Sequence, residues 1–168
     1  MTIEPKWLTV ARALRGVREV PGAGNSPTIM GWAAGKAKAF LGALYNADSV
    51  PWCGLFAAHC IAEAGLKPPA IALRAKSWAT WGVGLSREAL APGAVLVFER
   101  EGGGHVAFYV GEDDTAYHVL GGNQSDQVSI TRIAKARCIA RRWPASVPLV
   151  GRPVRMDPSS AGLSRNEA

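Results

Sequence analysis

The first half of the chain shows the apolar spacing that is typical of helices. Apolar side chains from Trp7 to Val17 recur every three or four residues, and the PGAG segment at residues 21–24 ends this pattern. Ser26 is a suitable N-cap before Pro27, so a second helix is predicted from there to about Tyr45.

The segment VPWCGLFAAHC at residues 50–60 predicts a third helix, which begins near Cys53 and ends at Gly65. A thiol at a helix N-terminus lies at the positive end of the helix dipole, which favours the reactive thiolate over the thiol. Cys53 has this position, whereas Cys60 lies two turns further into the helix. We therefore expect Cys53 to be the reactive thiol, and Cys60 and Cys138 to be buried and inert.

The second half of the chain has the pattern of a β-sheet. After a short helix predicted around residues 76–81, five β-rich segments follow, separated by Gly, Asp and Ser. These segments read GAVLVFER, GHVAFYVGE, TAYHVLGG, QVSITRIA and ARCIARRW. Helices followed by strands predict an α+β fold, in which the N-terminal helices pack on one face of a C-terminal antiparallel sheet. We expect residues 1–144 to form this domain and residues 145–168 to form an extended or disordered tail.

Composition and charge narrow the possible partners. A chain of 168 residues with 48% hydrophobic content can form one well-packed domain. Its net charge of +6 suits anionic partners such as nucleic acid, anionic lipid surfaces or the bacterial wall. The basic residues are scattered and no nucleic-acid-binding motif is present, so we expect no nucleic-acid partner.

The sequence contains no apolar run of the roughly 20 residues that a membrane-spanning helix needs. The N-terminal segment MTIEPKWLTVARALRG carries an early acid and an early tryptophan, and it lacks the apolar core and cleavage site of a secretory signal. We therefore expect a soluble, monomeric protein that accumulates in the cytoplasm.

The three cysteines are an odd number, and no cysteine or histidine pair has the spacing of a zinc site. On one helix, Cys53 and Cys60 would lie about 10 Å apart along the axis, beyond the roughly 7 Å between Cα atoms that a disulfide tolerates. We therefore expect no disulfide between them, no metal and no cofactor.

A cysteine nucleophile needs a base, and the chain has three histidines. His59 lies six residues after Cys53, on another face of the predicted helix. His118 lies within a strand segment without an obvious partner, and we expect a structural or surface role for it. His105 opens a strand directly after Gly102–Gly104, whose missing side chains allow a substrate to approach. His105 is therefore the expected base.

A third group usually orients the imidazole of a catalytic histidine, and the following strand supplies candidates. If a tight turn joins the two strands, His105 pairs with Leu120, and Asn123 lies on the wrong face. A β-bulge at Gly121–Gly122 would insert one unpaired residue and turn Asn123 towards His105. Asn123 is therefore expected to hold the imidazole, with the carboxylate of Asp126 as the alternative.

Several motifs together carry a resemblance to a known family: PWCGLF at a helix start, GHVAFYVG in a strand, and then VLGGNQSDQV and RRWP. Over about residues 5–144, the chain resembles the CHAP and NlpC-type superfamily of papain-like cysteine amidases and endopeptidases, which cleave peptidoglycan stem peptides. The resemblance implies Cys53 as nucleophile, His105 as base and Asn123 as third member. Many CHAP members carry an acidic residue shortly before this Asn, where the present chain has Gly121–Gly122. The acidic calcium loop of some members has no counterpart, so no metal is implied.

Further residues are expected to contact the substrate. Trp52 and Gln124 flank the expected catalytic residues, and Tyr45 or Asn46 either donates to the oxyanion or simply ends a helix. The nearby tryptophans either line a groove or pack in the core, and core packing is expected for at least two of the three: Trp52, Trp78 and Trp81.

The resemblance implies a peptidoglycan hydrolase that cleaves an amide bond of the stem peptide, as an endopeptidase or as an N-acetylmuramoyl-L-alanine amidase. It is closest to the small single-domain members found in phage endolysins and related bacterial proteins. The expected role is therefore that of a lytic protein, which meets the wall after the membrane opens or after injection. The alternative is a non-catalytic wall-binding or virion structural module that keeps the fold. The presence of Cys53, His105 and Asn123 together argues against this alternative.

Overall fold

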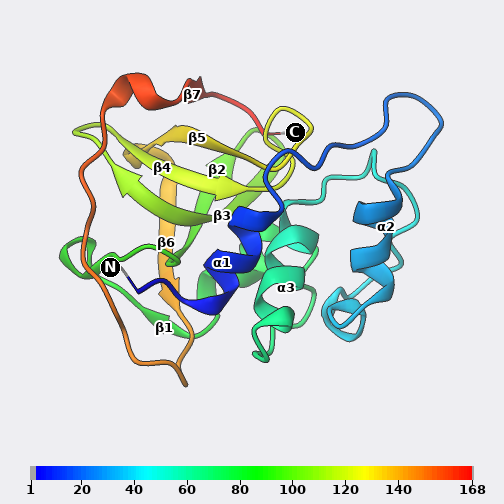
Figure 1. The fold of residues 1–168 in the computed structure, drawn as a ribbon, viewed down its shortest axis with the longest axis horizontal. Helices are drawn as coiled ribbons and strands as arrows, with labels where there is room; N and C mark the ends of the chain where they lie inside the picture. The colour runs from blue at the N-terminus through cyan, green and yellow to red at the C-terminus, as the bar shows by residue number, and fades with distance from the viewer. Residues whose placement is uncertain (1–2, 168) are drawn as a thin grey trace.

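The computed structural model describes residues 3–167 and shows a seven-stranded sheet beside three helices (Figure 1). The strands lie in the order β1-β6-β2-β3-β4-β5-β7, and all neighbours are antiparallel except the parallel pair β5 and β7. The α+β class is thereby confirmed, although the sheet is mixed rather than purely antiparallel. The strands are β1 (Val83–Gly84), β2 (Val95–Arg100), β3 (Gly103–Glu112), β4 (Ala116–Gly121), β5 (Ser129–Ala134), β6 (Cys138–Trp143) and β7 (Leu163–Ser164).

Three α-helices pack beside the sheet: α1 (Lys6–Ala13), α2 (Pro27–Ala34) and α3 (Cys53–Glu63). Helix α3 lies between the other two and contacts both of them as well as strand β3 (Figure 1). Nine of the eleven residues of α3 are buried, so α3 is the central helix of the core. The buried residues include the first two, and packing therefore fixes the position of the helix N-terminus. No helix within residues 3–167 has the length and apolar content to cross a bilayer. The short 3-10 helices are η1 (Lys38–Phe40), η2 (Ala75–Thr80), η3 (Arg87–Ala89), η4 (Lys135–Arg137) and η5 (Pro158–Ser160).

Helices α1 and α2 are shorter than their apolar patterns predict. Helix α1 ends at Ala13. Ser26 caps α2 as predicted, because its hydroxyl accepts a backbone N–H at 3.3 Å. The helix nevertheless ends at Ala34, because Gly35 takes an extended conformation there. The predicted continuation of this helix to Tyr45 is therefore wrong.

The pairing of β3 with β4 differs from the predicted register. Leu120 lies opposite Phe108 and not opposite His105, because β3 extends further than predicted before the chain turns. The register shift lies within β3, at residues 109–111. The predicted bulge at Gly121–Gly122 is therefore wrong.

Gly121 and Gly122 instead permit close packing. A Cβ added at Gly122 would lie 2.7 Å from the Cβ of Phe56 and 2.8 Å from the ring of Trp52. A Cβ added at Gly121 would lie 2.6 Å from Oε1 of Gln124. The double glycine therefore allows the end of β4 to approach the N-terminus of α3.

We expect Gly122→Val to lower the free energy of unfolding by about 1–3 kcal/mol, because the added side chain overpacks the core beside Phe56 and Trp52. Urea unfolding measures the difference. Gly162→Val is the matched control, since a Cβ there meets no atom within 4 Å. This control is expected to change stability by less than about 0.5 kcal/mol. Equal stability of the Gly122→Val and wild-type proteins would contradict the packing described.

The C-terminal tail, residues 145–167, contains the short helix η5 and strand β7 and packs against the sheet. Its strand β7 pairs with β5, and the carboxylate of Glu167 forms an ion pair with Arg137 at 2.6 Å. The last described residues of the tail lie beside the loop that follows β4 (Figure 1). The described part of the tail is therefore ordered, and it reaches the loop that carries the expected third catalytic residue.

Candidate active site

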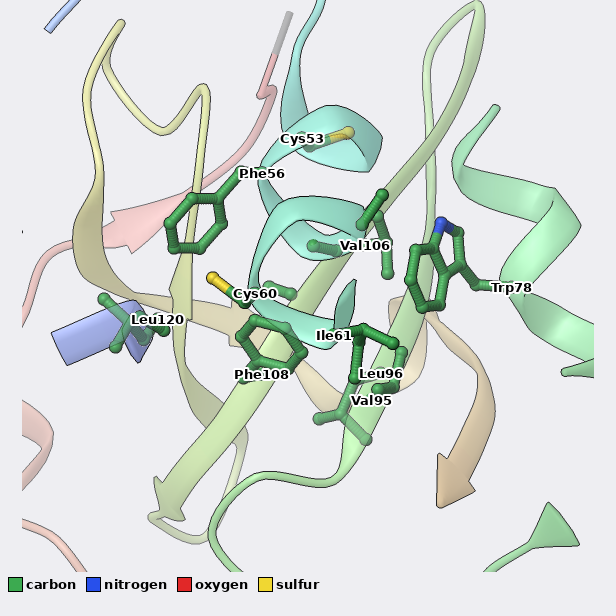
Figure 2. Packing of buried hydrophobic residues seen from close by; sticks show 14 of the residues in the cluster. Cys53, Phe56, Cys60, Ile61, Trp78, Val95, Leu96, Val106, Phe108 and Leu120 are labelled. Atoms are coloured by element: carbon green, nitrogen blue, oxygen red, sulfur yellow. The ribbon is translucent and has the colours of Figure 1, made fainter. Parts of the chain in front are cut away.

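Cys53 is the first residue of α3, in the position that the sequence predicts. The N-cap residue, Trp52, offers no side-chain hydrogen bond, and the first helical bond runs from Phe56 N to Trp52 O at 2.9 Å. The N–H groups of residues 53–55 therefore have no acceptor among the described residues. Figure 2 shows Cys53 at this end of the helix, apart from Cys60, which lies among the packed apolar side chains.

The environment of Cys53 favours its thiolate. The residue is only 4% exposed, and burial by itself raises the pKa of a thiol. The neighbouring imidazole of His105 and its positive charge outweigh burial, helped by the N–H of Val106 and the charge of Arg100, so the pKa of Cys53 is lowered. In contrast, burial raises the pKa of Cys60 well above its ordinary value. Cys53 is therefore the better nucleophile of the two.

His105 lies on β3 opposite Phe98 of β2 and is fully buried. Burial lowers the pKa of an imidazole, but the neighbouring Cys53 thiolate with its negative charge and a hydrogen bond to Gln124 raise it by more. The net result is a raised pKa for His105 beside a lowered pKa for Cys53. Both shifts favour the thiolate–imidazolium form of the pair over the neutral form.

Gln124 determines which ring nitrogen of His105 is left for the cysteine. Its Oε1 lies 2.9 Å from Nε2 of His105, while its own Nε2 donates to the carbonyl oxygens of Ser129 at 2.6 Å and Val119 at 3.4 Å. Because these carbonyls can only accept, they fix the amide with its oxygen towards the imidazole. Nε2 of His105 therefore carries the proton of the neutral ring. Nδ1 is buried and makes no hydrogen bond of standard geometry, so it is available to interact with Cys53.

The residue that orients His105 is Gln124, and not Asn123 as predicted. Nδ2 of Asn123 donates instead to the backbone oxygen of Glu167 at 2.9 Å, in the C-terminal tail. Asp126, the alternative candidate, is exposed and forms no hydrogen bond with the imidazole. Both assignments failed because they depended on a bulge that does not occur.

The side chain of Gln124 fills the space beside Gly121, which has no side chain of its own. The family resemblance predicts an acidic side chain shortly before Asn123, where this chain has glycine. The amide of Gln124 occupies the space that a side chain at Gly121 would fill. The glycine at the position where many family members carry an acidic residue could have pointed to Gln124. A buried imidazole needs a hydrogen-bond partner, and without the acidic side chain a neighbouring polar residue must supply it.

The three residues expected to contact substrate support the site from within the core instead. Tyr45 is 5% exposed, and its hydroxyl donates to the carbonyl oxygen of Val50 at 2.9 Å. Trp52 is fully buried, and its indole N–H donates to Oε2 of Glu19 at 2.9 Å. Gln124 is buried behind His105. None of the three presents a free polar group to a substrate.

The remaining histidines and tryptophans have structural roles. His59 stacks on a neighbouring tryptophan ring, and Nε2 of the fully buried His118 lies 2.7 Å from a carboxylate oxygen of Asp113. Trp78 is fully buried like Trp52, as predicted for two of the three tryptophans, whereas Trp81 is half-buried. These histidines therefore do not compete with His105 for the role of base.

Glu167 is a feature of the site that sequence reasoning missed. Its carboxylate is buried and held by Arg137 and by the hydroxyl of Ser164, which together lower its pKa against the effect of burial. Its negative charge also contributes to the raised pKa of His105. Glu167 lies 62 positions after His105 in the sequence, and no local pattern connects the two residues.

We expect limiting iodoacetamide to modify Cys53 first in the native protein. Its lowered pKa increases the fraction of reactive thiolate, and the residue borders an open cleft. Cys60 is fully buried, while Cys138 is half-buried rather than buried as predicted and has a raised pKa. Peptide mapping identifies the modified residue, and His105→Ala is expected to slow the labelling of Cys53 at pH 7. Faster labelling of Cys60 or Cys138 would contradict the assignment.

The arrangement is suited to acyl transfer. It combines a thiol, an oriented imidazole and free backbone N–H groups at the start of α3, which can stabilise the negative charge of a tetrahedral intermediate. Within residues 3–167, no three His, Cys, Asp or Glu side chains gather into a group that could hold a metal ion.

Comparison with known proteins agrees with this chemistry. The family model of the CHAP domain matches residues 45–123, a span that includes Cys53 and His105 and ends just before Gln124. No curated protein matches the chain. CHAP domains are generally cysteine- and histidine-dependent amidohydrolases or peptidases. The resemblance seen in the sequence is thereby confirmed: residues 45–123 match the CHAP domain, which is consistent with a CHAP/NlpC-type peptidase-like domain.

Proposed function

We propose that this protein hydrolyses an amide bond of the peptidoglycan stem peptide, with Cys53 as nucleophile and His105 as base. The observation that carries the proposal is the Cys53 thiol at the N-terminus of α3, paired with an imidazole that Gln124 orients. The CHAP family indicates the substrate class. The scissile bond lies either within the stem peptide or between muramic acid and L-alanine.

The first step is proton transfer from the thiol. Nδ1 of His105 takes the proton of Cys53, while Nε2–H remains hydrogen-bonded to Gln124. The side-chain amide of Gln124 is uncharged. The imidazolium of His105 is therefore stabilised mainly by the charge of the Cys53 thiolate and less by that of the Glu167 carboxylate. The thiolate then attacks the carbonyl carbon of the scissile amide.

The N–H groups at the start of α3 then stabilise the oxyanion of the tetrahedral intermediate. His105 donates its proton to the leaving amine nitrogen, and the C–N bond breaks to give a thioester on Cys53. Water, deprotonated by His105, attacks the thioester. The acid product leaves and the thiol is restored.

We place this activity in a lytic protein such as an endolysin. The net charge of +6 supports this role, because a basic protein is attracted to the anionic wall. A non-catalytic wall-binding module would benefit equally from the charge. It would have no use for a thiol with a lowered pKa beside an oriented imidazole, and this feature favours the enzyme.

Digestion of purified sacculi tests the proposal. We expect new amino groups without new reducing sugar ends, and mass spectrometry of the soluble products identifies the bond. Binding to sacculi without release of any product would favour the non-catalytic module. Release of reducing ends would indicate cleavage of the glycan instead.

A further inference from the structure

A cleft of about 260 Å³ opens directly beside the nucleophile. Cys53 lines it together with two segments from different parts of the chain. Arg74 and Lys76, at the start of η2, contribute one segment. Arg100 at the end of β2 and Gly102–Gly104 at the start of β3 contribute the other. Three cations and no acidic side chain therefore line the cleft.

The charges of this cleft are available to a ligand. Arg74 is exposed and forms no ion pair or side-chain hydrogen bond within residues 3–167. Lys76 pairs with Glu99 at 3.0 Å, but both side chains are about half exposed, so the pair is weak and readily exchanged. A ligand of opposite charge therefore meets at least one cation without a partner.

The cleft is also held in a fixed shape. Nε and Nη1 of Arg100 donate to the carbonyl oxygens of Gly104 and Glu101, each at 3.1 Å, which fixes the guanidinium beside Cys53. On the other side, the lack of a side chain at Gly54 allows the start of α3 to touch the backbone just before Arg74. A Cβ there would lie 2.2 Å from a carbonyl oxygen of that segment. Both walls are therefore set by backbone contacts.

We propose that this cleft binds a free carboxylate of the substrate next to the scissile amide. Arg74, Lys76 and Arg100 supply positive charge, and the glycines at the start of β3 leave room for a peptide backbone. Stem peptides carry carboxylates beside their amide bonds, whereas a phosphate of the wall would lie on a separate polymer. The identity of the peptide rests on the proposed function, but the preference of the site for an anion does not.

A pair of alkylating agents tests the anion preference without a substrate. Iodoacetate is negatively charged and iodoacetamide is neutral, and both alkylate the Cys53 sulfur with loss of iodide. Relative to a small free thiol, we expect Cys53 to favour iodoacetate by about five- to tenfold at low salt, because nearby cations attract it. Arg74→Glu is expected to lower this ratio at least about threefold.

Arg152→Glu is the matched control, since Arg152 is an exposed arginine outside the cleft and the change in net charge is the same. This variant is expected to keep the wild-type ratio. A wild-type ratio equal to that of the free thiol, or an equal loss in Arg74→Glu and Arg152→Glu, would overturn the proposal.

Paired substrates then test the carboxylate itself. We expect kcat/KM for a stem peptide with free carboxylates to exceed that for the same peptide with carboxamides by about tenfold, mainly through KM. Arg74→Glu should remove most of this preference while the amidated peptide is still cleaved. Equal cleavage of both peptides by the wild-type protein would overturn the carboxylate site, whereas cleavage of neither would overturn the proposed function and leave the alkylation result standing.

Competition by inorganic phosphate as strong as that by acetate would indicate a general anion site and overturn the assignment to carboxylate.

Discussion

Cys53→Ala and His105→Ala are each expected to lower the rate of amide hydrolysis in sacculi by at least about a thousandfold. The two residues share one proton and act as a unit, so the double variant is expected to be about as inactive as either single variant. The release of amino groups per unit time measures all three. Thermal unfolding establishes that each variant remains folded.

Cys60→Ala is the matched control for the loss of a buried thiol. Cys60 lies in the apolar core of the same helix, and its raised pKa keeps it protonated. We expect this variant to lose some stability but to retain hydrolysis within about twofold of the wild-type rate. Substantial hydrolysis by folded Cys53→Ala protein would contradict the assignment of the nucleophile.

Gln124→Leu is expected to lower kcat/KM by about 10- to 100-fold, because the imidazole loses the partner that fixes its orientation and tautomer. The hydrogen bond to Gln124 raises the pKa of His105, so its loss should lower that pKa. Because the active ion pair needs a protonated imidazole, the alkaline limb of the pH–rate profile should move to lower pH. A role limited to stability would leave the pH profile unchanged.

Asn123→Ala and Asp126→Asn distinguish this account from the one that the sequence predicts. Neither side chain is hydrogen-bonded to His105, so both variants are expected to retain turnover within about twofold. Asn123→Ala should also lose about 1 kcal/mol of stability, since it releases the tail at Glu167. A loss of turnover in Asn123→Ala together with normal turnover in Gln124→Leu would restore the original assignment.

The sequence predicted the parts of the site that depend on local signals. The start of α3 at Cys53 follows from the apolar pattern and the helix dipole, and both are properties of one short segment. The strand of His105 was likewise visible from its β-rich run after a series of glycines. Both residues lie in the predicted elements, and the fold class followed from the order of helices and strands.

The third residue could not be predicted, because it depends on the register between two strands. A shift within β3 changes which residue faces His105, and nothing in the local pattern fixes its position. Side-chain direction is a further obstacle, since Gln124 reaches back into the space beside Gly121. The contact of Glu167 with Asn123 joins residues 44 positions apart, so only the folded chain reveals it.

We expect Cys53 to form a covalent thioester with the acyl part of a wall peptide during each turnover. Hydrolysis of sacculi in the presence of hydroxylamine tests it most directly, because hydroxylamine intercepts a thioester and leaves a hydroxamate at the new acyl end. We expect hydroxamate products that increase with hydroxylamine concentration and that disappear in Cys53→Ala. Products that carry only carboxylates at every hydroxylamine concentration, while the wild-type protein continues to hydrolyse the wall, would contradict it.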